Sequence, residues 1–316
     1  MTTNPEPAPG QPAPAAPARQ YTCNWCGTVS EGTTLNCPAC GASLDVRMNV
    51  TESGWSEVPG RRDMARIQMG SSSLQIEGAY VPVADYNLAA GDTVYFTHHV
   101  LLWQDPQVVI TVMSLKGGWK RMFAGLPLIM TQATGPGHIA FSHDAPGELI
   151  TVPIQPGQAV DVREHIFMVA SSHVTYDWFK SNIWFTTRTT NSKGETETET
   201  HYPLGMMMDR FAVAQGQKPG LLLLQAAGNV FVRRLQPGQT ILVKPTALVF
   251  KDPTVNMQLH FERPNTGWSA WGSWGSRYMW LRLQGPGRVA VQSVFDSVEG
   301  EGGNISNYSP ATETRW

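Results

Sequence analysis

Apolar and polar residues alternate along most of the chain beyond residue 72. The alternation is clearest behind three turn glycines, Gly91, Gly157 and Gly238. A period of two after a tight turn is typical of a strand that buries one face. No segment shows sustained helical periodicity, so we predict an all-β fold. The third and fifth residues after each glycine are apolar: Val94 and Phe96, Val160 and Val162, Ile241 and Val243.

A second motif divides the same region. Gly135 to Gly137 and Gly285 to Gly287 both read Gly-Pro-Gly between a bulky apolar run and an alternating run. We expect Ala226-Ala227-Gly228 to take the equivalent place in a third copy. Each copy then reads as strand, tight turn, strand, glycine turn, strand. Because no such unit buries its apolar face alone, the pattern predicts repeated β units stacked into a sandwich or barrel. The Gly-Pro-Gly segments become corners between strands.

The composition agrees with this picture and narrows the function. Of 316 residues, 41% are hydrophobic and only 15% are charged, with Gly 30 and Pro 23, which suits turn-rich β structure. A net charge of -2 gives no reason to expect nucleic acid or an anionic membrane as a partner. The Pro- and Ala-rich start is neither a signal peptide nor a membrane span, and no other apolar run could cross a bilayer. We therefore expect a cytoplasmic protein.

All four cysteines lie in two C-x-x-C knuckles separated by ten residues. This spacing brings four thiolates within reach of one tetrahedral metal ion and predicts a small zinc ribbon with one structural zinc. Two disulfides are the alternative, but a cytosolic chain would keep them reduced. A thioredoxin-like redox pair lacks its βαβ context. The expected ligands are Cys23, Cys26, Cys37 and Cys40.

The expected partner of the ribbon is a protein. Residues 1–60 carry five acidic and two basic side chains, and four thiolates around zinc add negative charge, which disfavours a phosphate backbone. Trp25 is a candidate contact, with packing over the zinc knuckle as the alternative. The composition divides the chain into a Pro/Ala leader at 1–20, the ribbon at 21–45, a linker at 46–72, a β-repeat domain at 73–295 and a flexible acidic tail at 296–316.

A Trp-rich segment, residues 266–280, is the second candidate contact. Trp268, Trp271 and Trp274 are spaced three apart among Gly and Ser, and Tyr278 follows. Exposed aromatic rings in a loop could stack on sugars or bases, or on a protein partner. The alternative is that they fold back to cap the β core.

Recognisable catalytic motifs are missing from the sequence. We find no G-x-S-x-G elbow, phosphate-binding Walker loop, H-E-x-x-H or G-x-G-x-x-G, and every cysteine is assigned to zinc. The His residues are scattered, so an enzyme would need a composite site assembled from distant strands. We therefore predict no catalytic residues and no cofactor besides zinc.

Three motifs resemble those of a known family, that of altered inheritance of mitochondria protein twenty-four. They are "AGLPLIMTQATGPGHIAFS", "PGELITVPIQPGQAVDVREHIFMVASSHVTYD" and "MWLRLQGPGRVAVQS", and the resemblance covers residues 74–295. It implies a β-rich fold similar to that of the tryptophan RNA-binding attenuator protein, commonly with self-assembly, and it brings no catalytic residue set. The ribbon, the Ala226-Ala227-Gly228 segment and the Trp-rich segment depart from the family pattern.

These observations favour a non-enzymatic, homo-oligomeric scaffold or adaptor whose ribbon docks a protein partner while the β domain self-associates. The alternative is a ligand-binding module for nucleic acid or carbohydrate that uses the Trp-rich loop, and an enzyme with an unrecognised composite site is third.

Overall fold

The computed structural model of the chain describes most of residues 20–309. The described residues are 20–23, 25–31, 36–42, 44, 51–58, 64–78, 80–113, 130–143, 146–190, 192, 194–262 and 278–309. Within these ranges there is no α-helix, and the only helical segments are two short 3-10 turns, η1 His98–Val100 and η2 Pro245–Ala247. The predicted all-β class is therefore confirmed.

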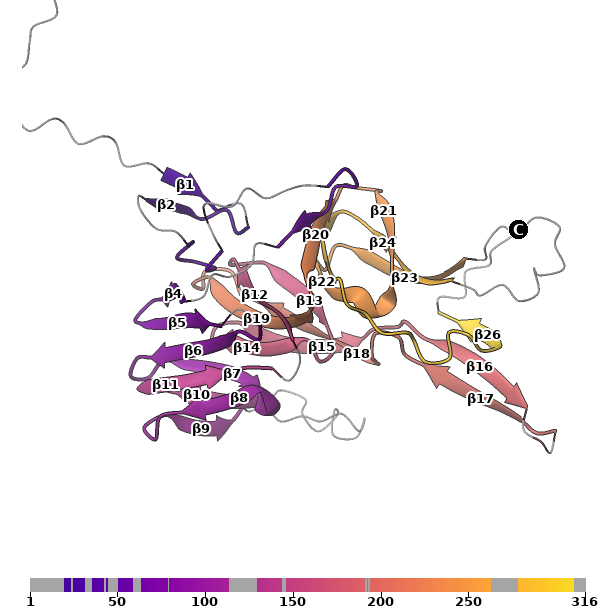
Figure 1. Cartoon of the computed structure of the whole chain (residues 1–316), viewed down its shortest axis with the longest axis horizontal. Coiled ribbons are helices and arrows are strands. Elements are labelled where there is room, and N and C mark those ends of the chain that lie inside the picture. Colours follow the sequence, from indigo (N-terminus) through magenta and orange to yellow (C-terminus); the bar gives the residue numbers. More distant parts are fainter. Residues whose placement is uncertain are drawn as a thin grey trace, which may run out of the picture.

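Strands between residues 65 and 227 form two sheets that pack face to face (Figure 1). The core between them contains Tyr86, Phe96 and Phe141, all fully buried. The first sheet has the order β4-β5-β6-β11-β8, with bounds Ala65–Met69, Ser72–Glu77, Val83–Leu88, Gly137–Phe141 and Leu101–Gln104. The second sheet has the order β12-β19-β14-β7-β10-β9, with bounds Gly147–Ile154, Gly220–Ala227, Phe167–Ser171, Thr93–Thr97, Met130–Thr134 and Val109–Val112.

A third sheet covers the other face of the second. Its order is β15-β18-β13-β22-β25-β20-β3, with bounds Thr175–Lys180, Met207–Ala212, Ala159–Arg163, Leu248–Lys251, Gly287–Gln292, Val230–Leu235 and Ser56–Glu57. The central strands of the second sheet are thus buried on both faces, whereas its edge strand β9 is exposed. Its β19 shows why the run of four leucines occurs, because Leu221 and Leu223 enter the first core while Leu222 and Leu224 enter the second.

Two smaller sheets complete the layers. The fourth sheet has the order β21-β24-β23, with bounds Thr240–Val243, Tyr278–Gln284 and Asn256–Glu262, and it packs on the third sheet through Leu281 and Leu283. A hairpin sheet, β17-β16-β26, has bounds Thr196–His201, Phe185–Thr190 and Ile305–Tyr308 and projects from the body (Figure 1). Phe185 anchors this hairpin sheet in the core between the third and fourth sheets.

The two Gly-Pro-Gly segments are corners at which the chain changes sheets. Gly135 to Gly137 joins β10 of the second sheet to β11 of the first, and Gly285 to Gly287 joins β24 of the fourth sheet to β25 of the third. Their surroundings also correspond. Asp105 Oδ2 accepts from His138 N at 2.8 Å in one corner, and Asp252 Oδ2 accepts from Arg288 N at 2.8 Å in the other. Both Gly-Pro peptide bonds are cis.

The middle segment differs from our expectation in one place. Ala226-Ala227-Gly228 closes β19 of the second sheet and leads into β20 of the third. Like the Gly-Pro-Gly corners it joins two sheets, but residues 213–219 are the segment that joins β18 of the third sheet to β19 of the second.

Two polar segments take part in sheets although composition suggested a linker and a tail. The segment 46–72 contains β3, which pairs with β20, and β4, which pairs with β5. The segment 296–316 contains β26, which pairs with β16. Sheet edges recruit such segments through backbone hydrogen bonds, which require no apolar side chains. The leader at 1–19 lies outside the described residues.

Candidate metal centre

The four cysteine sulfur atoms converge at one point. All four Sγ atoms lie within 4.8 Å of one another, and three of the four cysteines are buried. Cys23 Sγ lies 3.7 Å from Cys40 Sγ, and Cys26 Sγ lies 3.6 Å from Cys37 Sγ. Four thiolates around a tetrahedral ion with metal–sulfur bonds of about 2.3 Å would be separated by about 3.8 Å. The cysteines are free rather than disulfide-bonded, so this group could hold a metal ion.

The two knuckles have the same backbone turn. Gly27 N donates to Cys23 O at 2.9 Å, and Gly41 N donates to Cys37 O at 2.8 Å. Gly27 and Gly41 have φ angles of 75° and 71°, which glycine adopts without a steric penalty. The glycine that follows each C-x-x-C therefore closes the turn of its knuckle, and a short hairpin of β1 Gln20–Thr22 and β2 Val29–Glu31 flanks the first one.

Hydrogen bonding within the cluster favours a thiolate at Cys26, whereas bonds with Cys23 and Cys26 raise the pKa of Cys37. Bonds with the neighbouring thiols, that of Cys23 first and then those of Cys37 and Cys40, hold the pKa of Cys26 well below its usual range. Cys26 Sγ also lies 3.1 Å from Thr28 Oγ1. The described residues from 20 to 44, which we call the cysteine module, contain no other group of converging metal donors, nor does the rest of the described chain.

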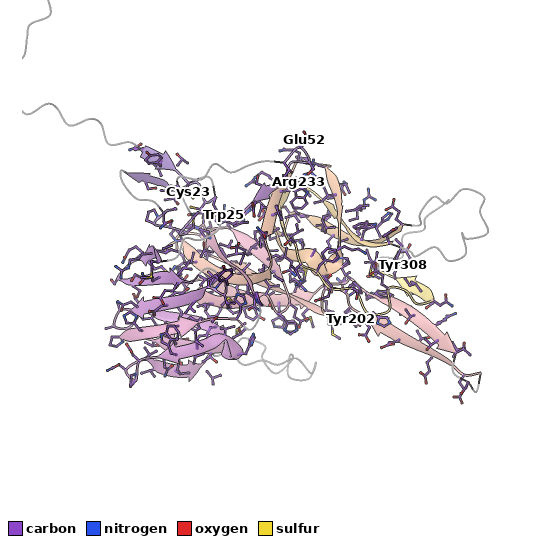
Figure 2. All side chains as sticks on the ribbon, viewed as in Figure 1. Cys23, Trp25, Glu52, Tyr202, Arg233 and Tyr308 are labelled. Atoms are coloured by element: carbon purple, nitrogen blue, oxygen red, sulfur yellow. The ribbon has the colours of Figure 1, made fainter. Side chains whose placement is uncertain are left out.

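The cysteine module is attached to the β layers through Trp25 (Figure 2). Trp25 Nε1 donates to Thr151 O of β12 at 2.9 Å, and Thr151 Oγ1 donates back to Cys40 O at 2.5 Å. The indole packs against both the cysteine cluster and the core between the second and third sheets. A further bond joins Gln68 N to Pro38 O at 3.2 Å. Trp25 therefore fixes the module on the body, and its contact with another protein stays a prediction.

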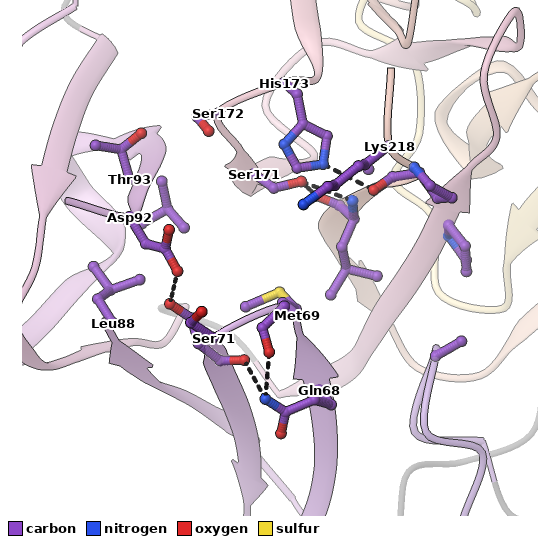
Figure 3. A pocket seen from close by; sticks show the side chains of 18 of the residues that line it. Gln68, Met69, Ser71, Leu88, Asp92, Thr93, Ser171, Ser172, His173 and Lys218 are labelled. Atoms are coloured by element: carbon purple, nitrogen blue, oxygen red, sulfur yellow. Dashed lines mark hydrogen bonds between the residues drawn. The ribbon is translucent and has the colours of Figure 1, made fainter. Parts of the chain in front are cut away.

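A pocket of about 730 Å³ lies where the module meets the first two sheets (Figure 3). Thr28 and Ala39 of the module line it together with the labelled side chains of Figure 3, among them Asp92 and Lys218. Its polar groups are engaged in internal bonds: Ser72 Oγ donates to Asp92 Oδ2 at 2.5 Å, and His173 Nε2 lies 2.8 Å from Pro219 O. The pocket is large enough to accept a small polar ligand.

The Trp-rich segment is described only at its end. Trp268, Trp271 and Trp274 lie outside the described residues. Tyr278 begins β24, is 46% exposed and stacks on Trp280 with ring centroids 6.2 Å apart. Lys244 Nζ lies 5.2 Å from the Trp280 ring, so a cation rests beside this aromatic pair. The choice between a binding loop and a core cap therefore stays open.

The sequence interpretation missed a buried charge cluster. Asp161 of β13 is fully buried and accepts two bonds from Arg210 of β18, at 2.6 and 2.9 Å, and one from Lys251 of β22 at 3.0 Å. The bond with Asp161 raises the pKa of Arg210 above its usual value. The signal available in the sequence was a carboxylate between two apolar residues, Val160 and Val162, in a predicted strand. The cluster joins three strands of the third sheet and leaves no open position for a substrate.

Scattered histidines are not drawn into one site in the described structure. His138 pairs with Asp85 at 3.1 Å, and His173 lies in the pocket wall. His201 is buried against Phe185, and its Nε2 lies 2.8 Å from Thr187 Oγ1. Each of these three has its own local partner. Among the described residues, no helix is long and apolar enough to pass through a bilayer.

Comparison with known proteins finds a family match for the part of the chain that forms the β layers. A family model described as mitochondrial biogenesis AIM24 matches residues 74–294. The crystal structure of protein SPYM3_0169 from Streptococcus pyogenes is similar to this chain, with 15% sequence identity and a TM-score of 0.48, and the similarity covers 71% of this chain and 94% of that one. No curated protein matches the chain. The family match begins at β5 and ends after β25, so the cysteine module lies outside it.

Proposed function

The chain belongs to the mitochondrial biogenesis AIM24 family, and on that premise we propose that it is a non-enzymatic, self-associating scaffold or adaptor that carries one structural zinc ion. The observation that carries this proposal is the cysteine cluster. Its sulfur–sulfur separations of 3.6 and 3.7 Å suit tetrahedral zinc. A hydrogen bond from Thr151 of β12 to the Cys40 carbonyl attaches the cluster to the β layers. Four thiolates leave zinc no open position for a substrate, which favours a structural role.

The surface that we propose for partner docking is the β1–β2 hairpin. Trp25 faces the body, whereas Tyr21 and Val29 on this hairpin are exposed. A tyrosine and a valine held on a metal-stabilised hairpin provide a small rigid contact for a protein partner. Reduced thiols are available in the cytoplasm, where we place the protein.

We also propose that residues 83–141, 147–227 and 230–292 are three copies of one β unit. The first and third share the succession strand, strand, 3-10 turn, four strands, with a Gly-Pro-Gly corner before the last. The likeness to the attenuator-protein fold that the family resemblance implies is part of this proposal. Such units expose sheet edges unless they meet another copy, which supports self-association.

The test for docking compares binding partners of the full chain with those of a hairpin variant. The double substitution Tyr21→Glu, Val29→Glu removes the apolar contact without touching a cysteine, and Tyr80→Glu is the matched control because Tyr80 is also exposed but lies between β5 and β6. We expect a partner that the wild type and the control retain and the hairpin variant loses. Identical partner sets for all three proteins would contradict docking at the hairpin.

A second candidate function is ligand binding at the aromatic pair Tyr278 and Trp280. The observation that favours it is Lys244, whose Nζ lies 5.9 and 5.2 Å from these two rings and suits an anionic, flat ligand. Titration with a single-stranded oligonucleotide and with a neutral oligosaccharide, followed by Trp fluorescence, tests it. Saturable binding that is lost in Trp280→Leu would support this function, and no response to either probe would contradict it.

A further inference from the structure

Three pairs of strands in the chain are equivalent position by position. Counted from the turn glycines Gly91, Gly157 and Gly238, the residues of β7, β13 and β21 correspond without a gap. The same count continues through the next turn, so that β8, β14 and β22 also correspond. Each unit therefore has one strand of the β7 type and one of the β8 type.

Two antiparallel pairings between a strand of one type and a strand of the other occur inside the chain, and we call each of them a joint. β7 pairs antiparallel with β14, with Phe96 opposite Val169 and Tyr95 opposite Ala170. β13 pairs antiparallel with β22 at the corresponding positions. There Val162 lies opposite Phe250 and Asp161 lies opposite Lys251.

A side-chain bond accompanies both joints. Thr97 Oγ1 donates to Phe167 O at 3.3 Å in the first joint, and Arg163 Nε donates to Leu248 O at 2.7 Å in the second. The two donors occupy one equivalent position, and the two acceptors occupy another. The joint is thus a repeated element with a defined register rather than a single accidental contact.

Among the described strands, the remaining strand of each type has a partner on one side only. β8 is the last strand of the first sheet, and β21 is the first strand of the fourth. Figure 1 shows them on opposite sides of the molecule, with the second and third sheets between them. Within the described structure, β8 therefore leaves a free edge of the β8 type and β21 leaves a free edge of the β7 type.

Exposure distinguishes these free edges from the internal joints. Trp103 of β8 is 45% exposed, whereas the equivalent residues Val169 and Phe250 are fully buried. Leu242 of β21 is 40% exposed, whereas the equivalent Tyr95 and Asp161 are buried. Leu102 on β8 is also exposed. Large apolar side chains on an open sheet edge favour association with another strand.

We propose that copies of this chain join head to tail through antiparallel pairing of β8 in one copy with β21 in the next. The two internal joints set the register, with Trp103 opposite Val243 and Gln104 opposite Leu242. The position of Thr97 and Arg163 is occupied on β21 by Lys244, which also carries a donor and lies 2.8 Å from Glu301 in the single chain. The first sheet of one copy then continues into the fourth sheet of its neighbour.

This pairing rests on the self-association in the proposed function and specifies its interface. The surfaces are different on the two sides, so the contact is heterologous and forms a closed ring or an open filament, depending on the rotation at each joint. A different occupant of the β8 edge, the β8 strand of a second copy, predicts different behaviour in the test below.

The test uses one charge on each edge. Trp103→Glu disables β8 and leaves β21 intact, and Leu242→Glu does the reverse; both side chains are exposed, so folding is preserved. Sedimentation velocity of the full chain should show an assembly for the wild type and for the control Tyr80→Glu, and single chains of 34.7 kDa for each variant alone. An equimolar mixture of the two variants should form a dimer that does not grow, because one intact β21 meets one intact β8.

The outcomes separate this inference from the broader proposal. Assembly of both variants at the wild-type size would overturn β8–β21 pairing while leaving self-association in place. Monomeric variants that stay monomeric when mixed would overturn the head-to-tail arrangement, and so would assembly of Leu242→Glu alone, which is expected for a contact between two β8 edges. A wild-type chain that is monomeric at every concentration would overturn self-association itself. Unchanged circular dichroism spectra and melting temperatures of the two variants serve as the folding control.

Discussion

The indole of Trp25 and the backbone of Thr151 connect two parts of the chain that are 126 positions apart. Trp25 Nε1 donates to Thr151 O, while Thr151 Oγ1 donates to the carbonyl oxygen of Cys40, so the hydrogen bonds run in both directions between the cysteine module and β12. The cysteine cluster and the β layers are therefore coupled mechanically, and a change on either side should be detected on the other.

The first prediction concerns this coupling. Trp25→Phe keeps the aromatic packing and removes one hydrogen bond, which should lower the free energy for opening the module by about 1 kcal/mol. Native-state hydrogen exchange of the Gly27 and Gly41 amides measures that opening. Tyr21→Phe, which removes a hydroxyl from an exposed ring in the same module, should leave the exchange rates unchanged. Equal rates in Trp25→Phe and the wild type would contradict the coupling.

The second prediction concerns the metal. The wild type should contain one zinc per chain, and the double substitution Cys37→Ser, Cys40→Ser should abolish it, because two hydroxyls cannot replace two thiolates as zinc ligands. Elemental analysis of the purified protein measures the ratio. Ala39→Ser adds a hydroxyl in the same knuckle and should keep the metal. A folded, protected module without any metal would disprove the zinc assignment.

The third prediction concerns the buried charges. Asp161→Asn leaves Lys251 buried without its counter-charge and weakens both bonds to Arg210, so the free energy of unfolding should fall by about 3 kcal/mol. Urea denaturation monitored by Trp fluorescence provides the measurement. Glu197→Gln on the exposed strand β17 removes one acidic charge at the surface and should change stability by less than about 0.5 kcal/mol. A similar small effect for both substitutions would argue against a stabilising role of the cluster.

The fourth prediction concerns the two corners. A Cβ added to Gly135 would collide with the Ala89 carbonyl and the Leu88 side chain, and one added to Gly285 would collide with the Gln236 carbonyl and the Leu235 side chain. Since both collisions involve backbone, Gly135→Ala and Gly285→Ala should each destabilise the chain, by a similar amount of about 1–3 kcal/mol.

The control for the corner substitutions is Gly302→Ala, where an added Cβ meets no atom within 4 Å. Its melting temperature should match that of the wild type, whereas both corner variants should melt at lower temperatures. If only one of the two substitutions lowered the melting temperature, the correspondence between residues 83–141 and 230–292 would not extend to the packing around their corners.

The features that sequence could predict are the local ones. Period-two alternation behind Gly91, Gly157 and Gly238 predicts strands, and the C-x-x-C-G knuckles predict a metal cluster, because each depends on residues close in the chain. The way strands combine into layers could not be predicted, since it depends on pairing between distant segments. β3, for example, pairs with β20 although 172 positions separate Glu57 from Asn229, whose side chains are also bonded.

Two further features depended on tertiary surroundings. Asp161 is a polar residue in an otherwise apolar strand, and only the pairing of β13 with β18 and β22 shows which cations compensate it. Trp25 was a candidate for partner contact or for packing on the knuckle, and the structure places it against β12, a strand from another part of the chain. The residues close to Trp25 and Asp161 in the sequence do not indicate which distant strands lie beside these two side chains.

Native mass spectrometry of the full chain most directly tests the account that this protein is a zinc-bearing, self-associating scaffold, because it counts protein copies and metal ions in the same particle. We predict assemblies of several 34.7 kDa chains with one zinc per chain. A single chain that holds no metal at any protein concentration would contradict the account.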